Sequence, residues 1–264
     1  ASANSFNVVM TSTETGGGAS AGTGTDVEPY EVIGPINQTF QYGWGTSTYG
    51  ASTWGTARTS SQLILDPGSW SLDNFGEKLI ATIHNGKTFI WDPSLASPLT
   101  RRAVIASGNP TKSVMSIVSD RDRHLIQLGT ETTIGSGTTQ DRMYVRFSDQ
   151  EDETDYVPTS TNTAGTMYLD QGNKIVGAVQ GKDYILILTD TAAYIMQYVG
   201  PPFTFSIRQV GSDCGAIGQH SIVYANGVVF WMGATGGFFM FDGSVKTVPC
   251  LVEDFVFTTQ GNNL

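Results

Sequence analysis

The chain has 264 residues, with 24 acidic against 14 basic side chains and a net charge of −10, which argues against a protein that grips nucleic acid by its phosphates. Charged residues are only 14%, while 31 glycines and 10 prolines disfavour helix interiors and an apolar fraction of 39% argues against disorder, so the composition predicts a folded, turn-rich β protein. No apolar run approaches the roughly 18 residues that a membrane-spanning helix needs, which excludes that class.

Residues 1–36 are expected to be the partial end of an upstream β domain. Residues 6–10 and 30–33 have the composition of strands, and the tract TSTETGGGASAGTGT between them is too small and polar to build a core. The chain opens on Ala1 without an initiator Met or a signal-peptide pattern, so we expect its natural start to lie upstream and find no indication of secretion.

Residues 37–69 are expected to form a glycine-rich and aromatic arm or linker. The stretch YGWGTSTYGASTWG spaces Tyr42, Trp44, Tyr49 and Trp54 among glycines, which let a backbone lie close to a neighbouring surface while the rings supply contact area. Two interpretations stay open: an arm docked on a partner protein, and a loop folded back on the chain's own β domain. A platform that stacks sugars is a further possibility, although no polar groups around the rings specify a sugar.

Residues 70–264 show short β-branched and aromatic runs separated by two- to four-residue turns, which is the pattern of β-hairpins. In LIATIH-NG-KTFIW, Asn85 and Gly86 supply the positive φ angles of a type I′ turn. Four such units follow one another. Because small sheets with two apolar faces must stack on one another, we predict an all-β fold, a propeller-like stack of short antiparallel sheets. A flat β-sandwich is the rival interpretation.

The spacing of the units supports this prediction. If Glu77, Arg123, Asp183 and Gly227 are equivalent points before the strongest strand of each unit, successive offsets are 46, 60 and 44 residues. A period of about 40–50 residues with several strands per repeat is typical of propeller blades, and four units would make a small or incomplete ring.

Residues that could carry catalysis are sparse. His84, His124 and His220 lie near strand ends, outside any zinc-binding spacing, and are interpreted as structural or surface imidazoles. The chain contains no nucleophile elbow, phosphate-binding loop, dinucleotide-binding fingerprint or sialidase-type Ser-x-Asp-x-Gly-x-x-Trp box. We therefore expect no enzyme, no catalytic residue, no metal and no cofactor, although a pair of carboxylates from different strands could still form a glycosidase site.

The densest acidic run holds five carboxylates within seven residues, Asp149, Glu151, Asp152, Glu153 and Asp155. It lacks the Gly and Glu positions of an EF-hand loop, and mutual repulsion favours a solvated loop. A docking patch, or a patch facing the bore of a channel, and a cation site are the alternatives.

Cys214 and Cys250 match no zinc spacing and are too few for a disulfide framework. Two buried thiols in a reducing compartment are the expected state. A single bridge between them is the alternative, and it would favour an extracellular β scaffold.

Several stretches together resemble one family of virion proteins. These are TSTETGGGA, YGWGTSTYGASTWGT, LDPGSWSLDNFGEKLIATIHNGKTFIWDPS and the run from GSDCGAIGQH to PCLVEDFVF. In this order they resemble the tail hub or nozzle proteins of short-tailed bacteriophages, also described as head-completion or packaged-DNA-stabilisation proteins. The resemblance covers most of the chain and is weak between residues 112 and 175.

The resemblance implies a propeller-like core, no catalytic residues and a structural protein of the phage tail that is assembled in the host cytoplasm. It implies a ring, commonly a homohexamer, that connects the portal adaptor to the distal tail, holds tail spike or fibre proteins, and passes viral DNA during ejection without reading its sequence. A chain of net charge −10 suits such a conduit, because carboxylates in the bore repel phosphates. The alternative function is a carbohydrate-binding or carbohydrate-active β-propeller at the host surface.

Overall fold

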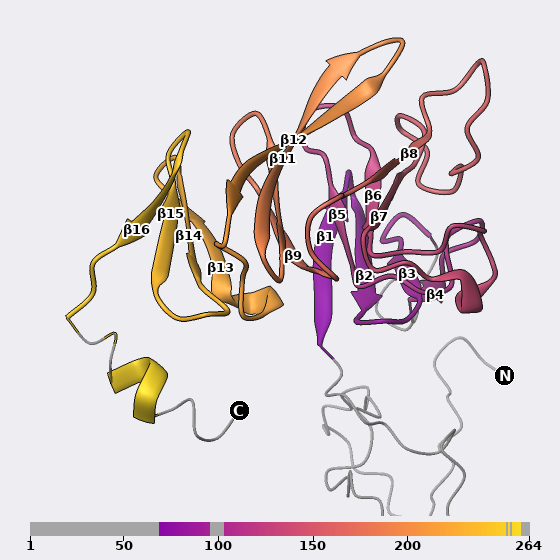
Figure 1. The fold of residues 1–264 in the computed structure, drawn as a ribbon. Helices are drawn as coiled ribbons and strands as arrows, with labels where there is room; N and C mark the ends of the chain where they lie inside the picture. Colours follow the sequence, from indigo (N-terminus) through magenta and orange to yellow (C-terminus); the bar gives the residue numbers. More distant parts are fainter. Residues whose placement is uncertain (1–68, 96–102, 252, 254, 260–264) are drawn as a thin grey trace, which may run out of the picture. The chain divides into compact units, whose positions relative to one another are not determined.

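The structure is a computed structural model that describes residues 69–95, 103–251, 253 and 255–259 (Figure 1). All of these residues belong to one compact unit. The expected upstream domain of residues 1–36 and residues 37–68 of the arm, with their four aromatic side chains, lie outside the described residues.

The described residues form four antiparallel sheets, and each sheet consists of four strands that follow one another in the sequence (Figure 1). The first sheet contains β1 (Trp70–Phe75), β2 (Lys78–Ile83), β3 (Thr88–Trp91) and β4 (Val104–Ile105). The second contains β5 (Met115–Val118), β6 (Leu125–Leu128), β7 (Tyr144–Phe147) and β8 (Gly165–Tyr168). The third contains β9 (Ile175–Gln180), β10 (Ile185–Thr189), β11 (Ala192–Gly200) and β12 (Thr204–Ser212). The fourth contains β13 (Ile222–Ala225), β14 (Val228–Met232), β15 (Phe238–Phe241) and β16 (Val245–Val248).

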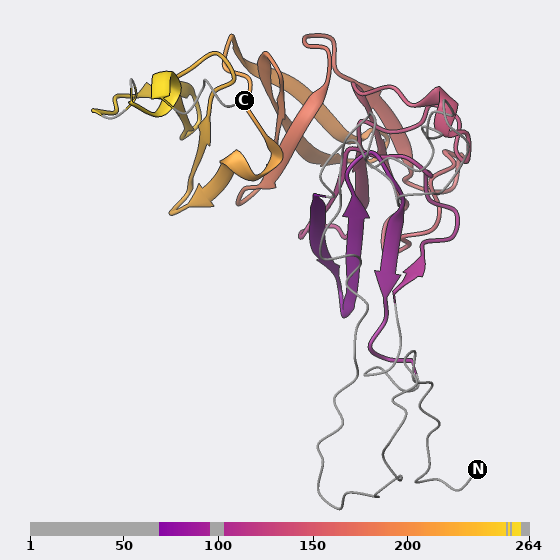
Figure 2. The same ribbon diagram turned by 90° about the horizontal axis from the view of Figure 1, so that it is seen from below.

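Consecutive sheets pack face to face. Figure 2 shows the sheets in sequence order, from indigo for the first to yellow for the last. Ile117 and Ile126 of the second sheet share one buried cluster with Ile187 of the third, whose opposite face packs Leu186 and Leu188 against the fourth. The first strands β1, β5, β9 and β13 contact one another in that order. The fold is therefore an all-β, propeller-like stack of short antiparallel sheets, as the sequence predicts, and the two-sheet sandwich is wrong.

The four residues taken as equivalent points in the sequence all lie just before the second strand of a sheet. Glu77, Arg123, Asp183 and Gly227 come one or two residues before β2, β6, β10 and β14. The longest offset contains a long connection, residues 148–164, between β7 and β8. We call this connection the acidic loop.

The turn after β2 differs from the prediction. Asn85 has a positive φ of 54°, but Gly86 does not, and the N–H of Gly86 donates to the carbonyl of Ile83 at 2.9 Å. His84 and Asn85 are thus the central turn residues, and the type I′ assignment to Asn85 and Gly86 is wrong because β2 and β3 last pair at Thr82 and Thr88, which leaves a five-residue loop. The fourth sheet does have this turn: Asn226 and Gly227 have φ angles of 50° and 87° between β13 and β14.

The contact between the first and second sheets is partly polar. The Thr82 hydroxyl lies 2.8 Å from that of Thr88 and 2.6 Å from that of Ser116, and all three are buried. Gln127 donates to Thr88 at 3.1 Å, and the N–H of Ser116 donates to the Ser71 hydroxyl at 3.1 Å. Buried polar groups that are paired in this way fix one mutual register of two sheets more strictly than apolar packing does.

The helical elements in the described residues are short: η3 (Gly137–Thr139), η4 (Gln219–Ser221) and η5 (Phe255–Thr259), and Glu253 is helical as well. Among the described residues, no helix has the length and apolar character that crossing a membrane requires.

Candidate functional site

The acidic loop places its five predicted carboxylates where each has a partner. Asp149 accepts hydrogen bonds from the N–H of Gln150 at 2.8 Å and from the N–H and hydroxyl of Thr163 at 2.7 and 2.5 Å. Asp152 accepts from the N–H and hydroxyl of Thr154 at 2.8 and 2.6 Å. Partial burial acts to raise the pKa of Asp149, but the Thr163 bonds prevail and lower it, and the Thr154 bonds lower the pKa of Asp152.

The remaining three carboxylates tie the acidic loop to itself and to its surroundings. Asp155 accepts from the side-chain amide of Asn162 at 2.9 Å, and Glu151 pairs with Arg123 at 3.0 Å on the surface. Glu153 is 7% exposed and pairs with Lys78 of the first sheet. That bond is the main cause of the raised pKa of Lys78.

These hydrogen bonds and ion pairs show that the carboxylates hold the acidic loop in one conformation. The loop's role as a docking patch or a patch facing the bore stays a prediction, because no partner is present. Among the described residues, no group of three or more His, Cys, Asp or Glu side chains is placed to hold a metal ion.

The histidines and cysteines are separated from one another. His124 is fully buried beside Phe147 and Phe205, His220 lies in η4, and His84 lies in the turn after β2. Cys214 is buried and Cys250 half-buried, and both are free thiols, so the alternative of a bridge between them is not formed in the structure.

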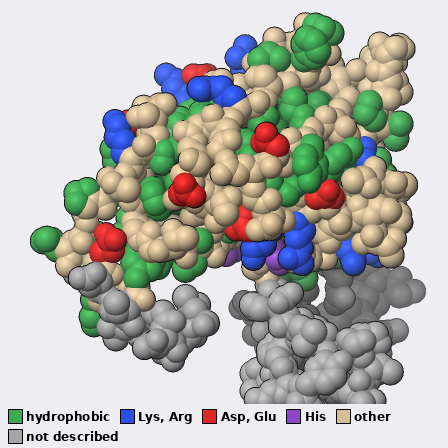
Figure 3. Space-filling model, in the orientation of Figure 1, with side chains coloured by type: hydrophobic (Ala, Val, Ile, Leu, Met, Phe, Trp, Pro, Cys, Tyr) green, Lys and Arg blue, Asp and Glu red, His purple; other side chains and the backbone are tan. Residues whose placement is uncertain are grey.

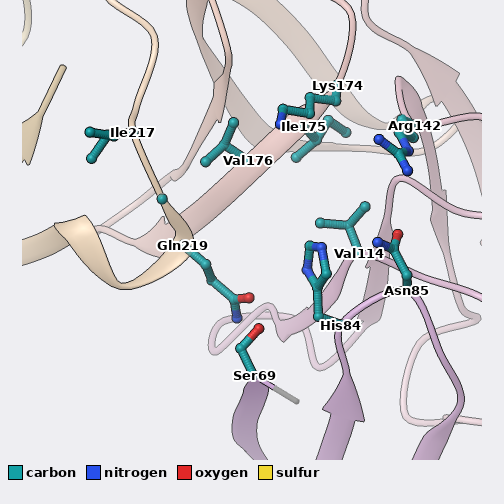
Figure 4. A pocket seen from close by; sticks show the side chains of 11 residues that line it. Ser69, His84, Asn85, Val114, Arg142, Lys174, Ile175, Val176, Ile217 and Gln219 are labelled. Carbon is teal, nitrogen blue, oxygen red and sulfur yellow. The ribbon is translucent and has the colours of Figure 1, made fainter. Parts of the chain in front are cut away.

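A cavity of about 200 Å³ lies where the first strands of the sheets begin. Figure 4 shows that its walls come from the residue before β1, the turn after β2, and the segments that lead into β5, β7, β9 and η4. Its polar side chains are Ser69, His84, Asn85, Arg142, Lys174 and Gln219. Loops at one end of a stack of sheets meet here because every sheet starts its first strand at the same end.

The cavity is polar and locally positive. In the view of Figure 4, Lys174 and Arg142 lie along one wall, and His84 and Gln219 lie along the other. Within the described part of the chain, neither Arg142 nor Lys174 forms an ion pair. The amide oxygen of Gln219 is buried without a hydrogen-bond partner. These groups could hold a small anion that also carries a hydroxyl donor, although the volume is below the roughly 300–1,000 Å³ of typical ligand pockets.

Sequence reasoning missed this cavity because its residues come from six separate segments. The signal that was available is weak: Lys174 immediately precedes β9, and Gln219 lies three residues before β13. Neither position has a motif, and only the stacking of the sheets brings them together.

The outer face of the first sheet, which we call the first end face, is apolar. Residues directly opposite one another on β1, β2, β3 and β4 share this face, and all but Asn74 are apolar: Trp70, Leu72, Asn74, Leu79, Ala81, Ile83, Phe89, Trp91 and Ile105. Leu72 is 65% exposed, and the rings of Trp70 and Phe89 lie 5.8 Å apart. No other described sheet packs on it.

The outer face of the fourth sheet, which we call the last end face, is apolar too. It consists of Val223, Ala225, Val228, Phe230, Met232, Phe238, Met240 and Val248, together with one charged residue, Lys246. Val223 is 56% exposed, and Figure 3 shows hydrophobic side chains protruding at the end of the molecule that the fourth sheet occupies in Figure 1. Phe257 of η5 lies with its ring 5.6 Å from that of Phe238.

Comparisons with known proteins give structural similarity alone. No family model matches the chain, and no curated protein matches it significantly. A crystal structure of Hsv2 from Kluyvelomyces marxianus is 10% identical, with a TM-score of 0.37, 65% of this chain and 44% of that chain covered. The computationally designed Ika4 protein is 11% identical, with a TM-score of 0.39, 67% of this chain and 92% of that chain covered. BBS1N, solved in complex with ARL6DN, is 11% identical, with a TM-score of 0.40, 68% of this chain and 54% of that chain covered.

The chain thus spans less than half the length of the Hsv2 chain that it matches. TM-scores below 0.5 at these identities give no basis for a function. The fold assignment depends on the four sheets themselves, and the resemblance to tail hub proteins stays a prediction.

Proposed function

We propose that the chain is a structural virion protein, a ring-forming tail hub or nozzle component of a short-tailed bacteriophage. In this role it connects the portal adaptor to the distal tail and forms part of the conduit for DNA, with no catalytic step of its own. The observation that carries the proposal is the pair of apolar end faces, because a protein that works alone in water seldom leaves two sheet faces of this kind exposed.

Two further features support the role. In the acidic loop, hydrogen bonds lower the pKa of Asp149 and Asp152, so the negative charge of these two carboxylates persists to lower pH than that of ordinary carboxylates. In addition, 24 acidic against 14 basic residues make the chain as a whole repel duplex DNA, which a conduit requires. In this role the protein is located in the virion tail, assembles as a homohexamer, and has the portal adaptor and tail spikes or fibres as its partners.

Electron microscopy of the purified oligomer tests the proposal. We expect a closed ring with an axial opening, and we expect no retention of duplex DNA by the protein even at low salt. A monomer at all concentrations, or salt-dependent DNA binding of the kind that phosphate contacts produce, would contradict it.

The polar cavity favours one second candidate, a carbohydrate-binding or carbohydrate-active function at the host surface. Arg142 and Lys174 could receive the carboxylate of an acidic sugar, and Gln219 could accept from one of its hydroxyls. Binding of host polysaccharide that is lost in Arg142→Ala and retained in Arg208→Ala, an arginine on β12 outside the cavity, would support it. Absence of binding and turnover would leave the structural role.

A further inference from the structure

The polar cavity lies where the first strands of the sheets begin, and every sheet supplies part of its wall. Asn85 follows β2 of the first sheet, Arg142 precedes β7 of the second, Lys174 precedes β9 of the third, and Gln219 lies in η4, before the fourth. Figure 4 shows these four side chains around one space. A ligand that contacts all of them therefore contacts all four sheets at once.

The charged side chains of the cavity are all basic. No acidic side chain of the described residues lines it, and Arg142 and Lys174 form no ion pair within the part of the chain that the structure describes. The nearby carboxylates have other partners: Asp141 accepts from a backbone N–H at 2.9 Å, and Asp190 accepts from the side-chain amide of Asn173 at 3.1 Å. Two cations along one wall, without a counter-charge among the lining residues, favour the binding of an anion.

The two amide side chains determine which hydrogen bonds the anion makes. The side-chain oxygen of Asn85 accepts from Gln140 at 3.2 Å, and in Figure 4 the amide nitrogen of Asn85, a donor, lies on the side of His84. The amide oxygen of Gln219 is an acceptor, and it is buried without a hydrogen-bond partner. A buried acceptor without a donor costs stability, and a hydroxyl group of the ligand would remove that cost. The ligand that fits is an anion that also donates a hydrogen bond.

The backbone of Gln219 is held in place by its own turn and by the third sheet. The hydroxyl of Ser221 donates to the carbonyl of Gly218 at 2.6 Å, which closes η4 around Gln219. On the other side lies Gly177 of β9, where an added Cβ would come within 3.2 Å of the Gln219 Cα. The unpaired oxygen therefore belongs to a residue with a fixed position.

We propose that this cavity binds inorganic phosphate. Arg142, Lys174 and the amide nitrogen of Asn85 bind its oxygens, and its hydroxyl donates to the amide oxygen of Gln219. Inorganic phosphate keeps at least one hydroxyl at neutral pH, whereas sulfate and the phosphodiesters of DNA have none. A volume of about 200 Å³ is small for an organic ligand but takes an ion of this size with several waters. This binding site goes beyond the structural role proposed above, which needs no ligand.

A comparison of two anions tests the site. Phosphate and sulfate are both tetrahedral oxyanions, and only phosphate has a hydroxyl at neutral pH. In isothermal titration calorimetry at equal ionic strength, we expect saturable binding of phosphate and at least about tenfold weaker binding of sulfate, because a sulfate oxygen would face the Gln219 oxygen with no proton between them. Phosphate is also expected to raise the melting temperature more than sulfate does, since the complete site exists only in the folded chain.

Three variants assign the binding to the cavity. Arg142→Ala is expected to weaken phosphate binding at least about tenfold, because it removes a charge-assisted hydrogen bond. Arg208→Ala, on β12 and outside the cavity, is the matched control and is expected to bind as the unmodified chain does. Gln219→Met keeps the length of the side chain and removes the acceptor, so the ratio of phosphate to sulfate affinity is expected to fall toward one. Circular dichroism checks that each variant is folded.

Several outcomes would overturn the phosphate site. Equal binding of phosphate and sulfate by the unmodified chain would do so, as would the absence of saturable phosphate binding. A preference for phosphate that survives in Gln219→Met would show that the amide oxygen does not receive the hydroxyl. Tighter binding of glucuronate, a sugar acid, than of phosphate would favour the carbohydrate function instead.

Electron microscopy of the same preparations keeps the two proposals apart. Rings formed by a chain that binds no phosphate would leave the structural role in place and refute the phosphate site. Phosphate binding, with the expected effects of the variants, by a chain that remains a monomer would support the site and contradict the structural role.

Discussion

The Asp73 carboxylate of β1 accepts a hydrogen bond of 2.7 Å from the backbone N–H of Val118 in β5, and this bond joins the first strands of two neighbouring sheets. Burial is the main cause of the raised pKa of Asp73. Val118 is 1% exposed, so its N–H has no access to water if the carboxylate is removed.

Two substitutions of Asp73 distinguish the effect of its hydrogen bond on stability from the effect of its charge. Asp73→Ala is expected to lower the free energy of unfolding by about 1–3 kcal/mol, because the N–H of Val118 is left buried without an acceptor. Asp73→Asn keeps an acceptor oxygen and removes a charge that burial disfavours, so its loss is expected to be smaller. Urea denaturation measures both, and equal losses would show that the charge and not the bond is what matters.

Replacing Trp231 tests the packing between the third and fourth sheets. Its indole N–H donates to the carbonyl of Cys214 at 2.8 Å, and its ring stacks on that of Phe239 with centroids 5.7 Å apart. Trp231→Ala is expected to destabilise the fold by about 3–5 kcal/mol through the cavity that it leaves. Trp54→Ala, in the predicted arm, is expected chiefly to weaken assembly. Thermal melting and sedimentation of both variants separate the effects, and equal melting losses would contradict a docking arm.

The sheets were predictable because their signals are local. Alternating apolar residues, and turn residues such as Asn226 with Gly227, determine a hairpin without reference to the rest of the chain. The same dipeptide at Asn85 and Gly86 does not form the predicted turn, because the closing bond from Gly86 to Ile83 moves the turn back by one residue. A dipeptide predicts that the chain turns at this point, while the register of the flanking strands decides the turn type.

The cavity and the state of the acidic loop were not predictable, because both depend on contacts between distant residues. Glu153 is paired with Lys78, which lies 75 positions away in the first sheet. A run of carboxylates read along the chain indicates repulsion and solvation. The structure instead gives each carboxylate a donor, and the donors of Asp149 include Thr163, on the far side of the loop.

Thiol reactivity distinguishes the two cysteines and tests the alternative of an extracellular scaffold. Burial raises the pKa of Cys214 to about 11, so its thiolate, the reactive form, is scarce at neutral pH. We expect one thiol, Cys250, to react with a thiol reagent in the native protein and both to react after unfolding. A Cys250→Ser control is expected to abolish the native reaction. Two unreactive cysteines that become available only after reduction would indicate a disulfide and favour the extracellular alternative.

His124 gives the protein a pH dependence that sets in as the pH falls below about 6.5. Burial lowers the pKa of His124, while the carbonyl of Ser148, which accepts from Nδ1 at 2.8 Å, and the carboxylates of Asp122 and Asp149 act in the opposite direction. Its Nε2 is buried without a partner, so a proton there would be poorly solvated.

Because the pKa of His124 is lower in the folded chain than in the unfolded chain, the free energy of unfolding falls as the pH falls. Below the unfolded pKa of about 6.5 the unfolded chain takes up a proton at this position, which the folded chain resists down to its lower pKa. Stability is therefore full above pH 6.5 and falls as the pH falls through that window, before ordinary carboxylates titrate near pH 4. His124→Gln, which cannot take up this proton, is expected to remove the decline between pH 7 and pH 5 in urea denaturation. Equal slopes in both proteins would contradict the role of His124.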